Sequence, residues 1–497
     1  MIIKTDKQSI ESYICDESGF CGGFADKAVV PESAQELAAV LKECSLNGTP
    51  VTVSAGGTGV TGGRVPVGGI VLSVEKFNAT GGIKVVNASE AVITAGAGVA
   101  IKELKEKAKA QGWLYAPDPT EQGSFLGGNI STNASGSRGF KYGPTRNYVK
   151  RLQIAFTNGE ILDIRRGEIF ASKDGVLKVP FKSGMLELKL PDYKLPQIKN
   201  AAGYFNSPGM DLIDLFIGQE GTLGVVIEAD VMLVPAIGRI LTGIAFFKEE
   251  DNSWDFVAEI KHLSSRTKKK ADKEGVDAMS LEYFDYGALE LLREDYADIP
   301  KQARAAVFFE QIVGDENNDV IIDKWAKAMD KFGVPLESVW FGTTEREEKL
   351  FRDFRHRLPE KVNEIVRRNK FPKTGTDLAV PDNRFMDMLR YYRAELDSSG
   401  IRTLMFGHIG ESHMHANLLP ENEADYEKSK AIYLELAKTA VSVGGTVSAE
   451  HGIGKLKHRF LEIMLGKNGV LELVRLKKQL DPSVILGRAN IFDEKLL

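Results

Sequence analysis

The sequence predicts an α+β protein built from more than one domain. A chain of 497 residues is long enough for two or three domains, each with its own core. Short apolar segments alternate with charged, helix-forming segments over residues 240–340, a pattern typical of an antiparallel sheet covered by helices. A hydrophobic content of 43% and a charged content of 27% are ordinary for a globular protein.

Composition argues against several classes of protein. The net charge of −5 is mild, so neither nucleic acid nor an anionic membrane surface is expected as the main partner. The three cysteines, Cys15, Cys21 and Cys44, lack CxxC spacing, which argues against a disulfide framework, structural zinc and an iron–sulfur cluster. No signal-peptide core and no window near 18 uninterrupted apolar residues occur. We therefore expect a soluble, cytoplasmic enzyme.

The first half of the chain alternates helices and strands. A capped amphipathic helix is expected over residues 33–47, since Ser33 and Glu36 form a capping-box pattern and Gly48 ends the helix. The other elements expected before Pro235 are strands over 51–53 and 70–74, a strand pair within 83–95, a helix over 100–111, a hairpin over 150–156 and 160–164, and a strand over 225–234.

After Pro235 the sequence favours an α+β unit with an antiparallel sheet. We expect strands over 240–247, 306–313 and 403–406, helices near 253–273, 316–332, 345–369 and 423–443, and a tail helix from 471 that ends at Asp481-Pro482.

A glycine-rich stretch, residues 54–63, has five glycines in ten residues between two apolar runs. Without Cβ atoms, successive backbone N–H groups can approach one anion, and Ser54, Thr58 and Thr61 add hydroxyl donors. The stretch lacks the lysine of a Walker loop, and a strand rather than a helix follows it. We expect a phosphate or pyrophosphate cradle; a hairpin loop without a ligand is the alternative.

A second small and polar stretch, residues 123–136, has no hydrophobic period of its own. Leu126 and its apolar neighbours make it too apolar for a solvated loop. We expect the side chains of Asn129, Ser131 and Asn133 to face a flat, polar ligand.

Six motifs occur in order along the chain, at residues 54–63, 118–120, 127–129, 217–224, 407–417 and 448–454. Together they resemble the flavin-linked oxidoreductases of the vanillyl-alcohol-oxidase fold, with its PCMH-type FAD-binding domain. The resemblance is to the branch of D-lactate, glycolate and D-2-hydroxyglutarate dehydrogenases, and it covers nearly the whole chain.

The resemblance implies three parts. Residues 1–235 form the two-subdomain FAD-binding domain, residues 236–455 form a ferredoxin-like cap of the FAD-linked oxidase C-terminal type, and residues 456–497 return to the FAD domain. No histidine precedes His262, so we expect FAD to be bound non-covalently. The implied cofactor-binding residues are Ser54, Ala55, Gly56, Gly57, Thr58, Gly59, Thr61, Gly62, Pro117, Asp118, Pro119, Thr120, Gly127, Gly128, Asn129, Ser131, Asn133, Glu220, Gly221, Gly224, Ile227 and Asn490.

Four of the seven histidines lie between residues 408 and 451. Imidazoles and a carboxylate from separate loops suit a divalent metal; histidines satisfied in a polar core are the alternative. The resemblance implies His408, His415 and Glu450 as ligands, for Zn²⁺ first, with Mn²⁺ or Fe²⁺ as alternatives. His413 stands where asparagine is common, and it is either an extra ligand or a pocket wall.

The implied reaction is oxidation of a D-2-hydroxy acid to the 2-oxo acid, with hydride passing to flavin N5. His451 is the expected base for the hydroxyl proton, and Asn417 is expected to bind the same substrate oxygens. Arg355 is the candidate for the substrate carboxylate, with a charged helix face as its alternative. Gly375 stands where a lysine is common, which favours D-lactate over dicarboxylates; D-2-hydroxyglutarate and glycolate remain alternatives.

Electrons must leave through an external acceptor, because the chain has no cluster of its own. An electron-transferring flavoprotein, a quinone, a cytochrome and an iron–sulfur partner are the alternatives. A homodimer and peripheral membrane association through the acceptor are further hypotheses. The rival functions are a sugar or lactone oxidase using O₂, a metal-dependent hydrolase whose glycine loops bind a nucleotide, and a non-catalytic flavin-binding protein.

Overall fold

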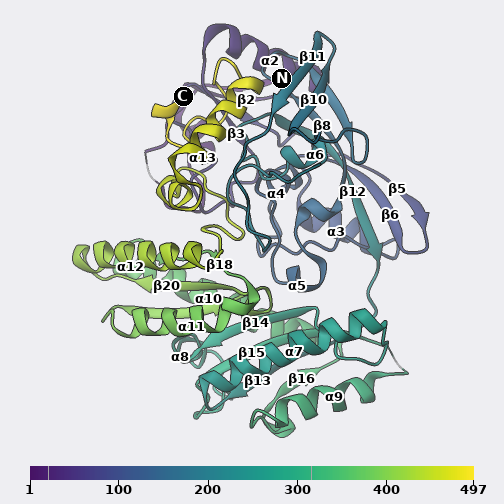
Figure 1. Cartoon of the computed structure of the whole chain (residues 1–497), viewed down its shortest axis with the longest axis vertical. Helices are drawn as coiled ribbons and strands as arrows, with labels where there is room; N and C mark the ends of the chain where they lie inside the picture. Colours follow the sequence, from purple (N-terminus) through teal and green to yellow (C-terminus); the bar gives the residue numbers. More distant parts are fainter. Residues whose placement is uncertain (21, 315) are drawn as a thin grey trace. The chain divides into compact units, whose positions relative to one another are not determined.

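The polypeptide passes between two structural units at residues 135/136, 143/144, 236/237 and 446/447 (Figure 1). The computed structural model describes residues 1–20, 22–314 and 316–497, so Cys21 lies outside the described residues. The first unit comprises residues 1–135, 144–236 and 447–497, and the second comprises 136–143 and 237–446. The chain rejoins the first unit at residue 447. The expected division of the chain into three parts, with the last boundary between residues 455 and 456, stays a prediction.

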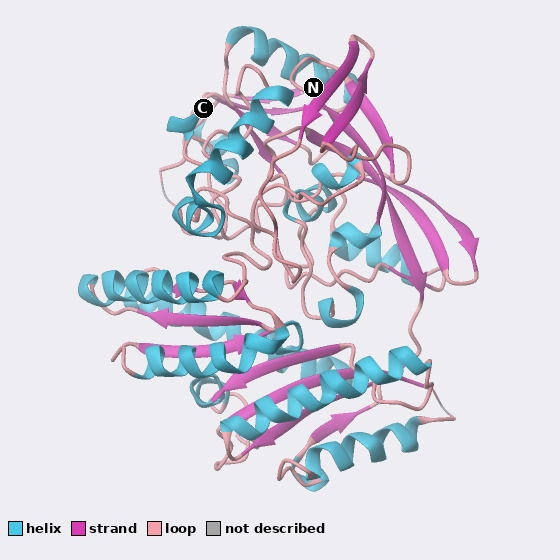
Figure 2. Cartoon of the chain, viewed as in Figure 1, coloured by secondary structure: helices cyan, strands magenta, loops and turns pink. Residues whose placement is uncertain are grey.

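Two sheets and a hairpin form the strands of the first unit in the described part of the chain (Figure 2). One sheet has the order β1-β2-β4-β3, in which β2, β4 and β3 are parallel and β1 is an antiparallel edge. The other has the order β5-β6-β12-β8-β9, with β7 also paired to β12, and is antiparallel throughout. The strands are β1 Ile2–Lys4, β2 Lys27–Val30, β3 Val51–Ser54, β4 Ile70–Ser73, β5 Thr80–Asn87, β6 Glu90–Gly96, β7 Trp113–Leu114, β8 Val149–Ala155, β9 Ile161–Arg165, β10 Val176–Phe181, β11 Gly184–Lys189 and β12 Val225–Pro235.

Helix α2 (Ala34–Asn47) begins and ends where the sequence predicts. Ser33 Oγ accepts the Glu36 N–H at 3.2 Å, and Gly48 ends the helix with a φ of 66°. The capping box is only half formed, because the Glu36 carboxylate accepts the N–H of Glu32 at 2.8 Å instead of the N–H of Ser33. The other helices of this unit are α1 Lys7–Ile10, α3 Ile101–Lys109, α4 Leu126–Thr132, α6 Leu212–Leu215 and α13 His458–Leu480.

One helix of this unit was not anticipated, and another begins earlier than expected. The stretch 123–136 contains helix α4, which Asn133 ends with a φ of 53°. Helix α13 begins at His458 rather than at 471. Gly466 interrupts it with a φ of 70°, a conformation that glycine adopts at no steric cost and that breaks the helical pattern in the sequence.

The second unit is built on one antiparallel sheet of order β16-β13-β15-β14-β19-β20-β17, with β18 paired to β20. Its strands are β13 Arg239–Phe247, β14 Ser280–Asp285, β15 Ala305–Val313, β16 Trp340–Gly342, β17 Thr374–Gly375, β18 Leu378–Ala379, β19 Arg402–Gly407 and β20 His413–Leu419. Its helices are α5 Gly139–Tyr142, α7 Glu250–Lys270, α8 Tyr286–Leu292, α9 Asn318–Asp330, α10 Glu345–Asn369, α11 Asp382–Asp397 and α12 Glu423–Ser442.

Helices cover both faces of this sheet, as the alternation along β15 shows. Phe308 packs into the cluster that contains Phe354 of α10 and residues of α8. Its neighbour Phe309 points to the other face, where it stacks on Trp325 of α9 with ring centroids 4.2 Å apart. Phe256 of α7 lies against the same tryptophan. The sheet is therefore buried between two helical layers, as an α+β fold requires.

Candidate functional site

The glycine-rich loop leaves the carboxyl end of β3, in the first unit. Within the described residues, no backbone N–H from Gly56 to Gly63 donates a hydrogen bond to a protein acceptor. Gly57 and Gly62 adopt φ angles of 78° and 74°, which a residue with a Cβ reaches only with strain. Successive N–H groups that the protein does not use form the kind of concavity that binds an anion.

The carbonyl groups of the same loop are held by the C-terminal part of the unit. The Lys455 N–H donates to Thr61 O at 2.9 Å, and the Lys455 ammonium donates to Gly62 O at 3.2 Å. Asn490 Nδ2 donates to Gly63 O at 2.8 Å. Protein donors therefore fix the carbonyl groups of Thr61, Gly62 and Gly63, but they do not fix the N–H groups of the loop. Because N–H groups are the donors that an anion needs, the loop fits the pyrophosphate of a dinucleotide.

Glu220 joins the loop to the segment around residue 453. Its backbone has a φ of 53°, its carbonyl accepts Asn490 Nδ2 at 3.0 Å, and its carboxylate accepts the N–H groups of Ile453 at 2.8 Å and Gly454 at 2.7 Å. Burial raises the pKa of Glu220 to about 7, although the two N–H donors and nearby lysines oppose the shift.

The residues of the 117–133 stretch lie in the same unit, but their polar groups are partly used by the protein. Asn129 Nδ2 donates to Ser124 Oγ at 2.8 Å and to Phe125 O at 2.9 Å. Asn133 Oδ1 accepts the N–H of Arg146 at 3.0 Å. Ser131 contributes its carbonyl to the Glu220 N–H at 2.8 Å. The expectation that these side chains face a ligand stays a prediction, and the contacts described here link helix α4 and its C-terminal residue to neighbouring segments.

Glu450 and His451 follow the return of the chain to the first unit. Glu450 Oε1 accepts Ser135 Oγ at 2.6 Å and lies 2.6 Å from Lys199 Nζ. The carbonyl of His451 accepts Thr61 Oγ1 at 3.4 Å, so the glycine-rich loop and this segment are in contact. The ligand role of Glu450 and the base role of His451 stay predictions.

Three histidines cluster in the second unit. His408 follows β19, and His413 and His415 project from the same face of β20, two residues apart, as expected. The ring centroids lie 4.4 Å apart for His413 and His415, 5.3 Å for His408 and His413, and 5.7 Å for His408 and His415. One ring nitrogen from each lies within 4.8 Å of the others, close enough to share one metal ion.

Each of these histidines also has an oxygen atom beside its ring. His408 Nδ1 lies 2.6 Å from Glu282 Oε1, and His415 Nδ1 lies 2.8 Å from the carbonyl of Thr376. Metal-binding histidines commonly donate their second ring N–H to such an oxygen, which fixes the tautomer and the ring orientation. The donor set and its surroundings therefore fit a divalent metal.

Strand pairing brings Glu282 to His408. In the β14–β19 pair Tyr283 lies opposite Gly407, so the next residues along, Glu282 and His408, are neighbours. Burial alone would raise the pKa of Glu282, but the adjacent His408 and Arg355 outweigh it and hold the pKa below its ordinary value. Sequence reasoning missed Glu282; the available signal was a glutamate between Leu281 and Tyr283, inside the strand Ser280–Asp285.

Arg355 and Asn417, the other expected catalytic residues, also lie in the second unit. Arg355 Nε donates to Glu282 Oε2 at 3.0 Å, so this nitrogen already serves the histidine cluster. Asn417 is buried on the face of β20 that carries the histidines, opposite Gly375 of β17. Their roles toward a substrate stay predictions.

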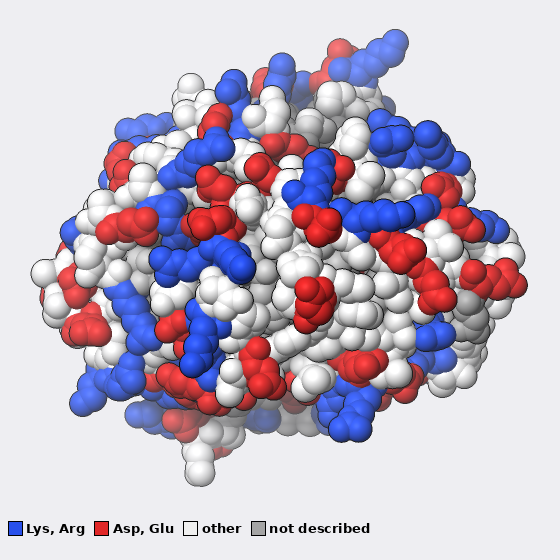
Figure 3. Space-filling model, turned by 90° about the horizontal axis from the view of Figure 1, so that it is seen from below, with Lys and Arg blue, Asp and Glu red and all other residues white. Residues whose placement is uncertain are grey.

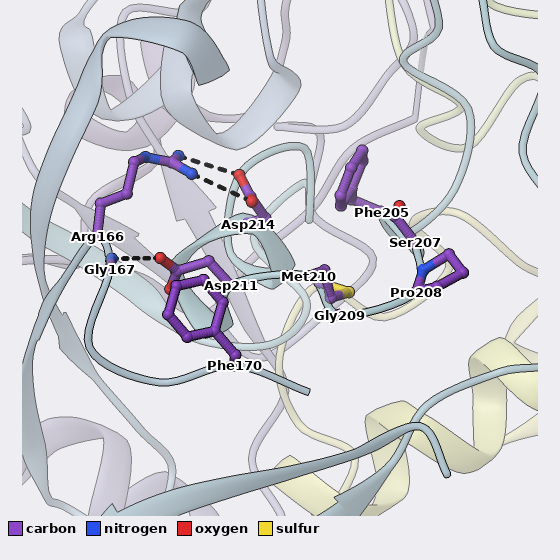
Figure 4. A pocket seen from close by; sticks show the side chains of 10 residues that line it. All are labelled: Arg166, Gly167, Phe170, Phe205, Ser207, Pro208, Gly209, Met210, Asp211 and Asp214. Atoms are coloured by element: carbon purple, nitrogen blue, oxygen red, sulfur yellow. Dashed lines mark hydrogen bonds and ion pairs between the residues drawn. The ribbon is translucent and has the colours of Figure 1, made fainter. Parts of the chain in front are cut away.

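The first unit also has an open pocket of about 430 Å³ away from these residues (Figure 4). Phe170, Phe205 and Met210 form its apolar wall, and Arg166 donates to Asp214 at 3.0 Å on its polar wall. None of the expected site residues lines it.

Figure 3 shows basic and acidic side chains interspersed over one face of the molecule. In the described residues no helix is long and apolar enough to cross a membrane.

Comparison with protein families matches residues 25–165 to an FAD binding domain and residues 256–491 to the C-terminal domain of FAD linked oxidases. The chain therefore belongs to the FAD-dependent oxidoreductases that combine these two domains. The expected fold class and family are confirmed.

Relatives of known name align over nearly the whole chain. The glycolate oxidase subunit GlcD of Bacillus subtilis (strain 168) is 29% identical over 94% of this chain and 89% of its own length. A D-lactate dehydrogenase of Anaerostipes hadrus is 27% identical over 97% and 92%. A D-2-hydroxyglutarate dehydrogenase of Xanthomonas citri pv. viticola is 26% identical over 99% and 94%. The chain is thus an FAD-linked dehydrogenase of the lactate, glycolate and 2-hydroxyglutarate branch.

The fold is shared more widely. A solved alkyldihydroxyacetonephosphate synthase aligns with a TM-score of 0.65 at 16% identity, covering 98% of this chain and 82% of the synthase chain. At this identity the likeness concerns the fold alone.

Proposed function

We propose that this protein oxidises a D-2-hydroxy acid, D-lactate first, to the corresponding 2-oxo acid. The observation that carries the proposal is the cluster of His408, His413 and His415, with oxygen atoms beside the rings. A sugar or lactone oxidase of the same fold does not need such a cluster. The relatives named as D-lactate dehydrogenases support the same substrate class.

The first unit supplies the cofactor-binding residues in this proposal. The N–H groups of loop 54–63 would hold the pyrophosphate of non-covalently bound FAD, and Lys455 and Asn490 keep the loop in shape by binding its carbonyls. When bound, FAD supplies the hydride acceptor through its isoalloxazine ring.

The second unit supplies imidazole ligands for a divalent cation. His408 and His415 would hold it, with Zn²⁺ as the first expectation and Mn²⁺ and Fe²⁺ as alternatives. The role of Glu450 as a further ligand rests on the family resemblance. A cation there supplies positive charge that favours the deprotonated form of the substrate hydroxyl.

The chain's own side chains would move the proton and orient the substrate. The hydroxyl proton passes to the neutral imidazole of His451, while the Cα hydrogen leaves with its electron pair as a hydride and the C–O bond becomes a carbonyl. Asn417 would bind the substrate oxygens. Arg355 would bind the carboxylate through Nη2, because its Nε donates to Glu282 and its Nη1 lies 3.3 Å from His356 Nε2.

A small monocarboxylate is the preferred substrate. Gly375 lies opposite Asn417 in the β17–β20 pair, at the position where a lysine is common in the family. Without that ammonium, the second carboxylate of 2-hydroxyglutarate would lack a partner there. The electrons then leave to an external acceptor, such as an electron-transferring flavoprotein, a quinone or an iron–sulfur partner.

The test is an anaerobic substrate panel with product identification. The purified, FAD-loaded protein is mixed with D-lactate, L-lactate, glycolate or D-2-hydroxyglutarate, and the flavin absorbance and the 2-oxo acid formed are measured. The proposal predicts reduction by D-lactate with equimolar pyruvate, and none by L-lactate. Reduction by none of the four acids, or by L-lactate alone, would overturn it.

A further inference from the structure

We infer that His413 is a third imidazole ligand of the metal site in the second unit. The family resemblance assigns His408 and His415, whereas His413 is this chain's own feature, since asparagine is common at that position. The inference rests on the metal-binding part of the proposed function and goes beyond it by assigning a ligand that the family pattern lacks.

The backbone directs His413 toward the other two histidines. Strand β20 places it on the same face as His415, with ring centroids 4.4 Å apart. Its ring lies 5.3 Å from that of His408, nearer than the 5.7 Å that separates His408 from His415. One ion within reach of His408 and His415 is therefore also within reach of His413, since the three ring nitrogens share the 4.8 Å limit.

His413 resembles the other two histidines in having an oxygen atom beside its ring, although this contact is an ion-pair distance and not one of the hydrogen bonds that His408 and His415 make. His413 Nε2 lies 3.1 Å from Asp377 Oδ1, and both side chains are fully buried. His408 has the Glu282 carboxylate at 2.6 Å, and His415 has the Thr376 carbonyl at 2.8 Å. An outer carboxylate raises the basicity of a ligating imidazole and fixes its orientation.

The buried negative charges near the histidines also favour a bound cation. Glu282 and Asp377 are two buried carboxylates next to three imidazoles. A buried negative charge is costly unless a positive charge or a metal offsets it. Arg355 pairs with Glu282, and a dication held by the three imidazoles would offset the charge near Asp377 as well.

The rival interpretation is an ion pair. A protonated His413 beside Asp377 would satisfy both side chains without binding metal. Substitution combined with spectroscopy separates the two cases, because loss of a ligand changes the coordination of the bound metal and hence its spectrum, whereas loss of a nearby ion pair leaves the ligand set unchanged.

The experiment compares wild-type protein with H413N, which restores the residue common in the family. H408N serves as the ligand-loss control, and H262N, on an exposed position of α7, as the matched neutral control. Zinc affinity is measured by chelator competition, and the Co²⁺-substituted protein is examined by absorption in the d–d region. We expect H413N to lower the zinc affinity at least 100-fold and to change the Co²⁺ bands, as H408N does, with FAD content unchanged. An affinity within twofold of wild type and unchanged bands would overturn the inference.

X-ray absorption of the zinc-loaded wild-type chain gives a second readout that does not depend on a variant folding. Multiple scattering from three imidazoles supports the inference, and scattering from two contradicts it. A wild-type protein that binds no divalent metal at micromolar concentration would overturn both the inference and the metal part of the proposed function. Metal binding that is insensitive to H413N would overturn the inference alone.

Discussion

Glu282 Oε1 lies 2.6 Å from His408 Nδ1, with both residues buried in the second unit. Because this contact engages Nδ1, Nε2 is the ring nitrogen that would bind the proposed metal, and Glu282 would act as a positioning residue for that site. We predict that E282Q lowers zinc affinity about 10- to 100-fold, because an amide orients the imidazole less firmly than a carboxylate does. Chelator competition measures this, with E421Q on the surface as the matched control. Equal affinities in E282Q and wild type would contradict the assignment.

His451 is proposed to take the hydroxyl proton, so its loss should affect turnover and leave the binding of cofactor and metal intact. We expect H451N to lower kcat about 10²- to 10⁴-fold, the usual contribution of a general base. Steady-state assays with D-lactate and an artificial acceptor give kcat, while the absorbance and zinc content of the same samples report FAD and metal. The H262N control should match wild type. A variant that keeps full turnover would exclude His451 as the base.

The glycine-rich loop should depend on its backbone conformation. Gly57 has a φ of 78°, and a Cβ there would lie 1.7 Å from an Arg64 guanidinium nitrogen. We predict that G57A strains the loop, misplaces its N–H groups and lowers FAD occupancy of the purified protein at least tenfold. The ratio of flavin to protein absorbance measures the occupancy. In G82A, where a Cβ meets no atom within 4 Å, occupancy should stay at the wild-type level; equal loss in both variants would speak against the cradle.

Glu220 should make stability depend on pH. Burial raises its pKa to about 7 in the folded protein, from an ordinary value of 4.5. Between these two values the folded state holds a proton that the unfolded state has lost, so stability falls as pH rises through this window, by about 3 kcal/mol in total. The E220Q variant should not show this loss of folding stability, because its side-chain amide does not titrate.

Apparent melting temperatures measured at pH 5 and pH 8 test the predicted effect of Glu220 on stability. Wild type should lose more stability than E220Q on going from the lower to the higher pH, and the exposed E106Q on α3 should behave as wild type. Parallel pH profiles of wild type and E220Q would show that Glu220 has the same pKa in both states.

Elements with strong local signals were predictable. Helix α10 spans Glu345–Asn369 as expected, because Thr344 caps it in a complete capping box and charged residues recur along its length on both sides of Pro359. Helix α4 was missed, since its seven residues are stabilised by packing and by its contacts with the strands around it rather than by propensity. The start of α13 was missed because Gly466 interrupts the helical period.

In the candidate site, too, the features with a local sequence signal were predictable and those that depend on tertiary contacts were not. His408, His413 and His415 lie within eight residues, so the cluster could be recognised from the sequence. Their partners come from elsewhere in the chain: Glu282 lies in β14, which pairs with β19, and Thr376 lies between β17 and β18, which both pair with β20. Such pairings depend on the whole sheet, and no local pattern around Glu282 indicates which residue it will face.

The most direct test of the central claim is an anaerobic absorbance titration of the FAD-loaded protein with D-lactate, before and after treatment with a chelator. We predict that D-lactate bleaches the flavin, that the chelator abolishes bleaching with FAD still bound, and that Zn²⁺ or Mn²⁺ restores it. A yellow protein that D-lactate and the other 2-hydroxy acids leave unbleached, or bleaching that the chelator does not affect, would contradict a metal-assisted 2-hydroxy-acid dehydrogenase.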